Sequence, residues 1–304
     1  MTVHIIQGDA AKSLKALADD SIECCVTSPP YWGLRDYGID GQLGLEQSPD
    51  EYVAKMVEVF AEVRRVLRND GTLWLNLGDS YNAGRDGGHP GGSKQWKPNE
   101  VKYQGRSGAN APGLKHKDLV GVPWRVAFAL QADGWYLRSD IIWHKPNPMP
   151  ESVTDRPTKS HEYVFLMTRS EKYFYDAEAV READQRSDPP RKASTRPERS
   201  GAVFPPHRGL RSATGRNGRG RNRRSVWTIP VASGRGRHFA TFPPALVEIC
   251  VLAGCPQGGT VLDPFAGSGT VGEVAEGLER SSVLIELNPE YVSMIKRRCW
   301  RGGR

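Results

Sequence analysis

The sequence predicts an α/β fold, in which a doubly wound and mostly parallel sheet is covered by helices on both faces. Short apolar runs of strand length alternate along the chain with segments whose apolar residues recur at helical spacing. This alternation is typical of parallel strands that are joined by crossover helices. The chain has 304 residues, which is enough for one large domain with a sizeable core.

In the N-terminal half, two segments show the local signals most clearly. The apolar run at 22–27 predicts a buried strand that stops at Ser28-Pro29-Pro30, because proline cannot donate a ladder hydrogen bond. Segment 49–67 predicts a helix, since its apolar residues recur at helical spacing behind Ser48, a suitable N-cap. The other elements expected here are a strand at 3–7, a helix at 10–18, a strand at 71–77, a helix near 119–132, and strands at 136–144 and 162–168.

The C-terminal part returns to regular alternation. The elements expected there are a helix at 243–253, a strand at 260–263, a helix at 270–277, a strand at 282–286 and a helix at 289–300. Two stretches without periodicity, at about 82–117 and 181–224, are rich in loop-forming residues and predict long loops.

Positive charge is concentrated in one segment. Residues 181–237 hold 15 Lys plus Arg against 4 Asp plus Glu, a balance of +11, whereas the whole chain is +7, so the rest sums to −4. A solvated loop would explain this, but arginine also matches phosphates and guanine edges, and Arg outnumbers Lys here by 14 to 1. The alternative to a solvated loop is a phosphate-contacting surface that includes an arginine cluster interleaved with Gly and Asn, namely Arg216, Arg219, Arg221, Arg223 and Arg224.

The five cysteines indicate neither a zinc site nor a disulfide framework. They are odd in number, form no CxxC pair and lie mostly in apolar runs, so buried reduced thiols are expected and no metal is predicted. No apolar run approaches the length that spans a bilayer, and the N-terminus lacks the pattern of a signal peptide. We therefore expect a soluble, cytoplasmic protein without a membrane partner.

A candidate cofactor site follows the strand at 260–263. The segment 261–270, VLDPFAGSGT, leads from a strand through a Gly-rich turn into a helix, whose first N–H groups are free to meet a ligand. It has neither the lysine of a phosphate loop nor the GxGxxG spacing of dinucleotide sites. Glu286 ends the next strand, where a carboxylate can accept both ribose hydroxyls. The pair indicates a nucleoside-containing cofactor without a pyrophosphate, although Glu286 alone could be a helix-capping acid.

A candidate catalytic site follows the strand at 22–27. In Ser28-Pro29-Pro30-Tyr31 the prolines fix the backbone, so the Ser28 hydroxyl and the Pro29 carbonyl can be held pointing one way. Two aligned acceptors suit an exocyclic NH2 group, which presents two donors, and Tyr31 can stack on a flat base. A proline-rich turn with an aromatic residue packed for stability is the structural alternative.

These motifs resemble those of one enzyme family. Ser28-Pro29-Pro30-Tyr31 resembles the (Asp/Asn/Ser)-Pro-Pro-(Tyr/Phe) catalytic motif of amino-methyltransferases, and the segment 263–270 is similar to their methyl-donor motif. The catalytic motif comes first, which is the circularly permuted order of the β-class DNA N4-cytosine and N6-adenine methyltransferases. Three further segments resemble that family: Gly8-Asp9, 143–150 with His161-Glu162-Tyr163, and 238–244.

The resemblance implies an S-adenosylmethionine-dependent methyltransferase fold with a seven-stranded sheet. It implies a catalytic half within 1–180 and a donor-binding half at 238–304. The resemblance does not cover the loop 82–117 of the first half or the basic segment 181–237, which we expect to be a DNA-recognition insert because of its charge. The target base would be swung out of duplex DNA to reach Ser28, Pro29, Pro30 and Tyr31. The resemblance is also compatible with a homodimer and with a companion restriction endonuclease. The residues expected to bind S-adenosylmethionine are Asp9, His238, Phe239, Pro243, Asp263, Pro264, Phe265, Gly267, Ser268, Gly269, Thr270 and Glu286.

The reaction expected is direct transfer of a methyl group to N4 of cytosine. Ser at the first motif position is more typical of the cytosine enzymes than of the adenine enzymes, which remain the first alternative. Methylation of protein or RNA, and a catalytically inactive DNA-binding protein, are less favoured by the permuted order and the intact motifs. A carbon-5 cytosine enzyme would need a thiolate nucleophile in a Pro-Cys dipeptide, whereas this chain has the reverse, Cys255-Pro256.

Overall fold

The computed structural model describes residues 1–34, 36–82, 111–182, 220–231 and 243–299. The chain divides into two compact units. One contains Met1–Asp176 together with Ser225–Arg304, and the other contains Ala177–Arg224. The elements of the first unit position the site.

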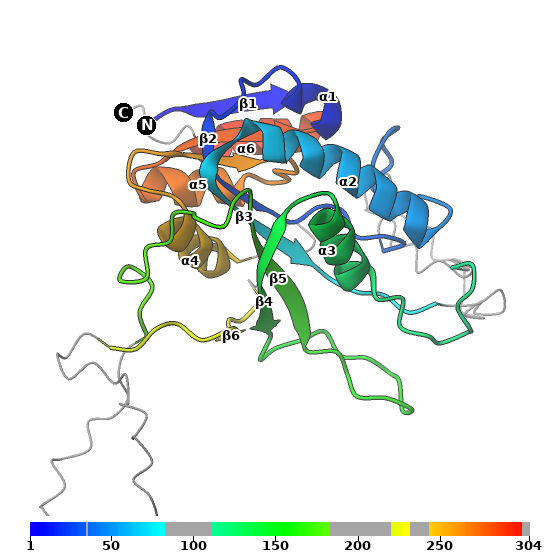
Figure 1. Ribbon diagram of the computed structural model, residues 1–304. Coiled ribbons are helices and arrows are strands. Elements are labelled where there is room, and N and C mark those ends of the chain that lie inside the picture. The colour runs from blue at the N-terminus through cyan, green and yellow to red at the C-terminus, as the bar shows by residue number, and fades with distance from the viewer. Residues whose placement is uncertain (35, 83–110, 183–219, 232–242, 300–304) are drawn as a thin grey trace, which may run out of the picture. The chain divides into compact units, whose positions relative to one another are not determined.

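A single mixed sheet of eight strands, in the order β1-β8-β7-β2-β3-β5-β4-β6, forms the centre of the first unit (Figure 1). β5 runs antiparallel to its neighbours β3 and β4, and the other five pairings are parallel. The strands are β1 (Val3–Gln7), β2 (Ile22–Thr27), β3 (Leu67–Leu77), β4 (Tyr136–His144), β5 (His161–Thr168), β6 (Val226–Thr228), β7 (Thr260–Asp263) and β8 (Ser281–Glu286). The mostly parallel α/β sheet expected from the sequence is confirmed.

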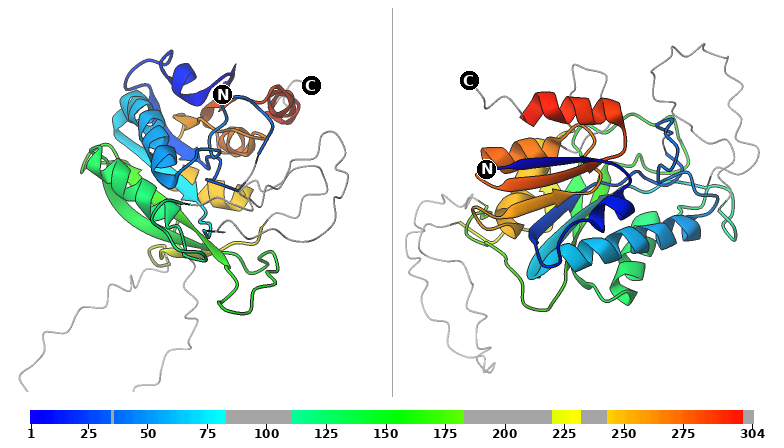
Figure 2. Two further views of the ribbon diagram at one scale, coloured as in Figure 1. Left: turned by 90° about the vertical axis from the view of Figure 1, so that its right-hand side faces the viewer. Right: turned by 90° about the horizontal axis from the view of Figure 1, so that it is seen from above.

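Helices cover both faces of this sheet, as Figure 2 shows. On one face α2 packs against both α1 and α3, and α4, α5 and α6 form the layer on the other face. The helices are α1 (Ala10–Leu14), α2 (Pro49–Val66), α3 (Val122–Ala132), α4 (Pro244–Gly254), α5 (Thr270–Gly277) and α6 (Pro289–Cys299). Because both faces are covered, the central strands are apolar along most of their length, and five of the six β2 residues are buried.

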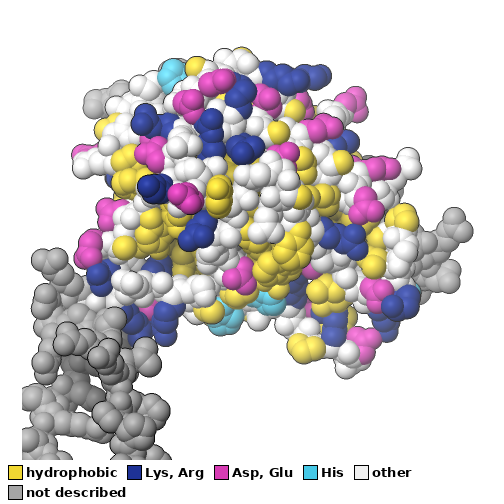
Figure 3. Space-filling view, viewed as in Figure 1, with side chains coloured by type: hydrophobic (Ala, Val, Ile, Leu, Met, Phe, Trp, Pro, Cys, Tyr) yellow, Lys and Arg dark blue, Asp and Glu magenta, His cyan; other side chains and the backbone are white. Residues whose placement is uncertain are grey.

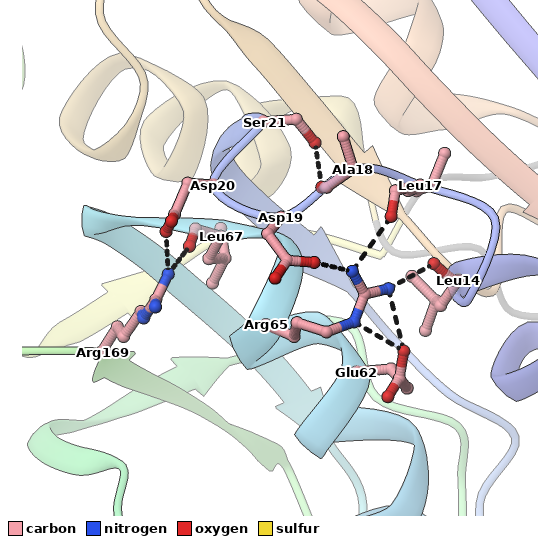
Figure 4. Close-up of polar contacts among 10 residues, drawn as sticks. All are labelled: Leu14, Leu17, Ala18, Asp19, Asp20, Ser21, Glu62, Arg65, Leu67 and Arg169. Carbon is pink, nitrogen blue, oxygen red and sulfur yellow. Dashed lines mark hydrogen bonds and ion pairs between the residues drawn. The ribbon is translucent and has the colours of Figure 1, made fainter.

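Arg65 of α2 anchors the connection that leads into β2 (Figure 4). Its guanidinium donates to the carbonyl oxygens of Leu14 at 2.9 Å and Leu17 at 3.0 Å, and it also binds Glu62 and Asp19. Arg169, which follows β5, contacts the neighbouring Asp20 in the same connection. These contacts satisfy carbonyls at the end of α1 and fix where β2 enters the sheet.

Several boundaries differ from the sequence prediction for local reasons. α1 ends at Leu14 rather than near residue 18, because the next N–H groups, those of Ala16 and Leu17, bond to carbonyls three residues back in a tighter turn. α3 starts at Val122 rather than near residue 119, because the Asp79 carboxylate accepts the N–H groups of Gly121 and Val122 and so fixes the helix start. β3 begins four residues early, at Leu67, directly after α2.

The strand count and the extent of the insert also differ from the expectation. The predicted seven strands become eight because Val226–Thr228 pairs in parallel with β4. This strand lies inside the segment 181–237 that the sequence assigned to the DNA-recognition insert. A three-residue edge strand carries no readable alternation, and its pairing with β4 is what makes it a strand.

Charges of both signs are interspersed on the face of the molecule shown in Figure 3. Lysine and arginine alternate there with aspartate and glutamate, around hydrophobic side chains. The described part of this face therefore has no large region of positive charge alone.

Candidate functional site

A cavity lies at the carboxyl ends of the parallel strands, where the chain order of the sheet changes direction. It is lined by the β1–α1 turn, the end of β2, the turn between β7 and α5, and the end of β8 with the start of α6. The candidate donor turn and the candidate catalytic motif both contribute to its wall. Ligands of open α/β sheets bind at such a crevice.

The Gly-rich turn after β7 needs glycine at two places. Gly267 and Gly269 both have positive φ angles, of 52° and 84°, which side chains other than glycine rarely adopt. A Cβ atom at Gly269 would also lie 3.1 Å from Ile295 of α6, so the turn is packed closely against that helix. Gly269 thereby becomes the N-cap of α5, and Gly267 lines the cavity.

Glu286 connects the end of β8 to this turn. Its Oε2 accepts the N–H of Gly267 at 2.7 Å, and its Oε1 accepts the N–H of Asn288 at 2.7 Å. Burial raises the pKa of Glu286 above its usual value, and these backbone hydrogen bonds oppose that rise. A carboxylate offers about four lone-pair sites, so each oxygen can still accept a hydroxyl from the cavity that Glu286 lines.

Asp263 joins the donor strand to the catalytic strand. Only 1% of the residue is exposed, and its Oδ1 accepts both the Thr27 hydroxyl at 2.7 Å and the Phe265 N–H at 3.0 Å. Burial raises the pKa of Asp263 to about 7, and the negative charge of Glu286 adds to the rise. Because Thr27 is the residue before Ser28, Asp263 fixes the position of the catalytic turn relative to the cavity.

A hydrogen-bonded cluster of Ser28, Tyr31, Asn76 and Glu162 lies beside the cavity wall. The Asn76 amide donates to the Tyr163 carbonyl at 3.1 Å and to Glu162 at 3.2 Å, which directs its oxygen toward the catalytic turn. That oxygen lies 3.2 Å from Ser28 Oγ and 3.0 Å from Tyr31 Oη. Tyr31 Oη also donates to Glu162 Oε2 at 2.8 Å and lies 3.3 Å from Ser28 Oγ.

Glu162 is itself held by a cation. Lys145 Nζ forms an ion pair with Glu162 Oε1, and the two side chains are only 18% and 16% exposed. The same ammonium lies 4.4 Å from the centre of the Trp143 ring. Nearby, the Lys159 ammonium has no hydrogen-bond partner among the described residues, and burial lowers its pKa. Lys145 therefore holds the carboxylate by the oxygen that Tyr31 does not contact.

The structure places most predicted donor-site residues together, though not all at the cavity. Those that line it are Asp9, Pro264, Phe265, Gly267, Ser268, Thr270 and Glu286, together with the catalytic-motif residues Ser28 and Pro30. Asp9 also caps α1 by accepting the Lys12 N–H. Pro243, Asp263 and Gly269 support the surrounding elements without lining the cavity. His238 and Phe239 lie outside the described residues.

The structure fixes the backbone of the catalytic turn and describes only part of the predicted arginine cluster. The Pro30 carbonyl accepts the Tyr52 hydroxyl at 2.9 Å, and Pro29 is buried, so the backbone of the turn is fixed. Arg216 and Arg219 lie outside the described residues. Arg221 and Arg224 both bind Glu182, within the unit Ala177–Arg224, and Arg223 lies between them in the chain.

Sequence reasoning missed one wall of the cavity and two members of the cluster. Tyr37, Ile39 and Leu43 line the cavity from the loop after β2, where no periodicity marks them. Asn76 and Glu162 carry no motif of their own. Glu162 lies in a segment with family resemblance, but only the pairing of β5 with β3 brings it beside Asn76.

The structure is consistent with the expectation of buried thiols. All five cysteines are buried, and none of them forms a disulfide. Among the described residues, no group of three or more His, Cys, Asp or Glu side chains is arranged to hold a metal ion. No helix in the described part of the chain is long and apolar enough to cross a membrane.

Comparison with known proteins agrees with the geometry. A family model for N6/N4 methyltransferases, described as DNA methylase, matches residues 22–297. The chain is 48% identical to the type II methyltransferase M.SmaI of Serratia marcescens, over 98% of this chain and 90% of that protein. It is also 48% identical to the type II methyltransferase M.Cfr9I of Citrobacter freundii, over 97% and 86% of the two chains.

Solved structures share the fold. The cytosine-N4-specific PvuII DNA methyltransferase superposes with a TM-score of 0.65 at 20% identity, covering 100% of this chain and 89% of the other. TTHA0409 of Thermus thermophilus, a putative DNA modification methylase complexed with S-adenosylmethionine, gives 0.61 at 23% identity, over 99% and 97%. The family match over most of the chain and the close relatives lead to one conclusion: this chain belongs to the DNA methylase family of N6- and N4-type amino-methyltransferases.

Proposed function

We propose that this protein transfers a methyl group from S-adenosylmethionine to the exocyclic N4 amine of cytosine in duplex DNA. The observation that carries the proposal is the Ser28 hydroxyl, which lines the donor cavity while its own proton can be accepted by Asn76 Oδ1 at 3.2 Å. The lone pairs of Ser28 Oγ are then available to accept a hydrogen bond from an amine that enters the cavity.

The cavity suits the methyl donor. Glu286 would accept the ribose hydroxyls, and the Gly267–Gly269 turn lets backbone approach the ligand without a side chain in between. Asp9, at the start of α1, lines the other side of the cavity. When bound, S-adenosylmethionine supplies an electrophilic methyl group on a sulfonium. No phosphate-binding lysine is needed, because the donor has no phosphate.

Ser28 and the Pro29 carbonyl would prepare the target amine. The lone pair of an aromatic amine is delocalised into the ring, so the amine is a poor nucleophile. Hydrogen bonds from its two N–H groups to these two acceptors would localise the lone pair and direct it at the methyl group. Because the donor is already activated, such positioning can supply much of the rate.

Cytosine is favoured over adenine by two observations. The first motif residue is Ser28 rather than the aspartate usual in adenine enzymes, and the solved structure of the PvuII enzyme, which is named as cytosine-N4-specific, has the same fold. Adenine N6 is the alternative target, since its amine would meet the same two acceptors.

We also propose that this is a site-specific, type II enzyme acting in the cytoplasm on bases flipped out of duplex DNA, with the segment 181–237 contacting the DNA. The curated relatives are named type II methyltransferases. The target amine is buried in base pairing, so it must leave the helix to reach Ser28. The charge balance of +11 in the segment provides the attraction to phosphate.

The substitution Ser28→Ala tests the assignment. It removes the proposed acceptor while leaving the donor turn intact, so the rate of methyl transfer to DNA should fall about 100-fold or more, with the affinity for S-adenosylmethionine close to wild type. Transfer of a radiolabelled methyl group and calorimetric titration of the donor measure the two quantities. An unchanged transfer rate would rule out the role of Ser28.

A further inference from the structure

We propose that Glu162 receives the proton released by the target amine, through a relay of hydroxyl groups from Ser28 to Tyr31 to Glu162. This inference rests on the proposed function, because it assumes that the amine binds at Ser28. It concerns the fate of the amine proton, for which neither Ser28 nor the Pro29 carbonyl provides a final acceptor.

A proton must leave during the reaction. The amine nitrogen forms a bond to the methyl carbon as the carbon–sulfur bond breaks, and the bonding electrons remain on sulfur in the departing thioether. The nitrogen then carries two hydrogens, a methyl group and a positive charge, so it must lose one proton to give the neutral methylamine. The N–H that already donates to Ser28 Oγ is the one placed to leave.

The distances define a continuous path for that proton. Ser28 Oγ lies 3.3 Å from Tyr31 Oη, and Tyr31 Oη donates to Glu162 Oε2 at 2.8 Å. While the tyrosine proton points to Glu162, Tyr31 Oη can accept from Ser28. Transfer along the path moves the amine proton to Ser28, the Ser28 proton to Tyr31 and the Tyr31 proton to Glu162. Both hydroxyls end neutral, and only Glu162 changes its charge.

Tyr31 is held in the geometry that the relay needs. A Cβ atom at Gly78 would lie 2.5 Å from Tyr31 Cε2, so the glycine allows the ring to lie directly against the backbone at the end of β3. Burial is the main cause that raises the pKa of Tyr31. A tyrosinate is therefore disfavoured at this position, and the hydroxyl must pass a proton on as it receives one.

Asn76 holds the two hydroxyl groups of the path in position. Its amide nitrogen is committed to Tyr163 O and Glu162, so its oxygen can only accept. It accepts the Ser28 hydroxyl at rest, and during transfer the Ser28 proton turns to Tyr31 Oη instead. Asn76 orients Ser28 and Tyr31, but its amide oxygen is a much weaker base than a carboxylate. Among the described residues of this cluster, Glu162 is the only carboxylate that Tyr31 contacts.

Lys145 holds the other oxygen of Glu162. Its ammonium pairs with Glu162 Oε1, while Tyr31 donates to Oε2, so the carboxylate is fixed with one oxygen facing the relay. Once Glu162 has received the proton, its side chain, which is 16% exposed, can release the proton toward solvent. Glu162 touches neither base nor donor in this scheme and acts as a positioning residue through Tyr31.

The test compares Glu162→Gln, Glu162→Asp, Tyr31→Phe and the double variant Tyr31→Phe/Glu162→Gln. Single-turnover rates of methyl transfer are measured with the enzyme and S-adenosylmethionine in excess over duplex DNA, in H2O and D2O. Affinities for the donor and for DNA are measured separately. Asp155→Asn is the matched control, because it likewise converts an ion-paired carboxylate to an amide, but Asp155 lies in the β4–β5 connection and pairs with Lys117 rather than with a relay residue.

A relay predicts a specific pattern of rates. Tyr31→Phe and Glu162→Gln should each lower the rate about 100-fold, the lower end of what acid–base catalysis supplies. The double variant should be no slower than either single variant, since all three break one path. Glu162→Asp should recover part of the rate. Wild type should show a slower rate in D2O, an effect lost in Glu162→Gln. Donor and DNA affinities should stay near wild type in all variants.

Several outcomes would overturn the relay. A wild-type rate in Glu162→Gln, additive losses in the double variant, or equal loss in the Asp and Gln variants would each do so. If Glu162→Gln fails to fold, Tyr31→Phe decides, because it deletes only the relay oxygen, and persistence of the isotope effect there would contradict the proposal. An inactive Ser28→Ala beside fully active relay variants would refute the relay and leave the proposed function standing. Product analysis showing N6-methyladenine would refute the cytosine assignment without affecting the relay.

Discussion

The substitution Asp263→Asn should stabilise the folded protein, and increasingly so as the pH rises. Asp263 is buried at the junction of β7 and β2, and both of its described hydrogen bonds, from Thr27 and Phe265, reach the same oxygen, Oδ1. Asparagine can present its carbonyl oxygen at that place and keep both bonds. The substitution therefore removes a buried negative charge with little change in packing.

The magnitude follows from the raised pKa of Asp263. Folding raises this pKa from 3.8 to about 7, mainly through burial. Such a group stabilises the folded state fully below its unfolded pKa, and that contribution is lost as the pH rises toward 7. About three pKa units correspond to about 4 kcal/mol. Relative to wild type, Asp263→Asn should thus gain about 4 kcal/mol in the free energy of unfolding at pH 8, and less than about 1 kcal/mol at pH 4.

Urea unfolding followed by tryptophan fluorescence at pH 4, 6 and 8 measures this gain. Asp155→Asn serves as the control of opposite sign. The bond from Lys117 lowers the pKa of Asp155, so its contribution is present above the unfolded pKa, and its removal at neutral pH should destabilise slightly. A gain for Asp263→Asn that does not change between pH 4 and pH 8 would refute the assignment of a buried, charge-destabilised carboxyl.

Two further predictions concern ligands. Glu286→Ala should weaken binding of S-adenosylmethionine by about 1–3 kcal/mol, because the polar groups that it pairs lose their acceptor, and calorimetry showing unchanged affinity would contradict its placement in the donor site. Replacing the arginine cluster by alanine should weaken DNA binding and reduce its salt dependence by about 0.9 per lost phosphate contact, while donor binding persists. DNA titrations at several salt concentrations test this. If the dependence of affinity on salt is unchanged, the segment 181–237 is a solvated loop that does not contact DNA. The cluster comprises Arg216, Arg219, Arg221, Arg223 and Arg224.

Much of the fold could be predicted because apolar runs, turn residues and helical spacing in the sequence mark the same elements that pack together in the sheet and its helices. The strand Thr260–Asp263 and the helix Thr270–Gly277 have the predicted bounds, since an apolar run, a Gly-rich turn and helical spacing mark them in succession. β6 could not be predicted, because three residues are too few to show a period, and only their pairing with Ile142–His144 of β4 makes them a strand. The end of α1 depends on hydrogen bonding within the turn that follows it.

The candidate site divides in the same way. The donor turn and the Ser28 turn are contiguous motifs whose backbone requirements are visible in glycine and proline. Asn76 and Glu162 are 86 residues apart and carry no shared pattern. They meet because β5 returns antiparallel to β3, with Leu77 opposite Tyr163. That register is a property of the folded sheet. The sequence therefore predicts Ser28, which is proposed to bind the target amine, but does not predict that Glu162 lies close to it.

Nucleoside mass spectrometry tests the central claim most directly. The chain is expressed in a host without DNA methylation of its own, and the genomic DNA is digested to nucleosides. Wild type should produce N4-methylcytosine, and Ser28→Ala should produce much less of it after the same short induction while still binding S-adenosylmethionine. N6-methyladenine as the only product would contradict the cytosine assignment, and unmodified DNA from a folded, donor-binding wild-type protein would contradict the account as a whole.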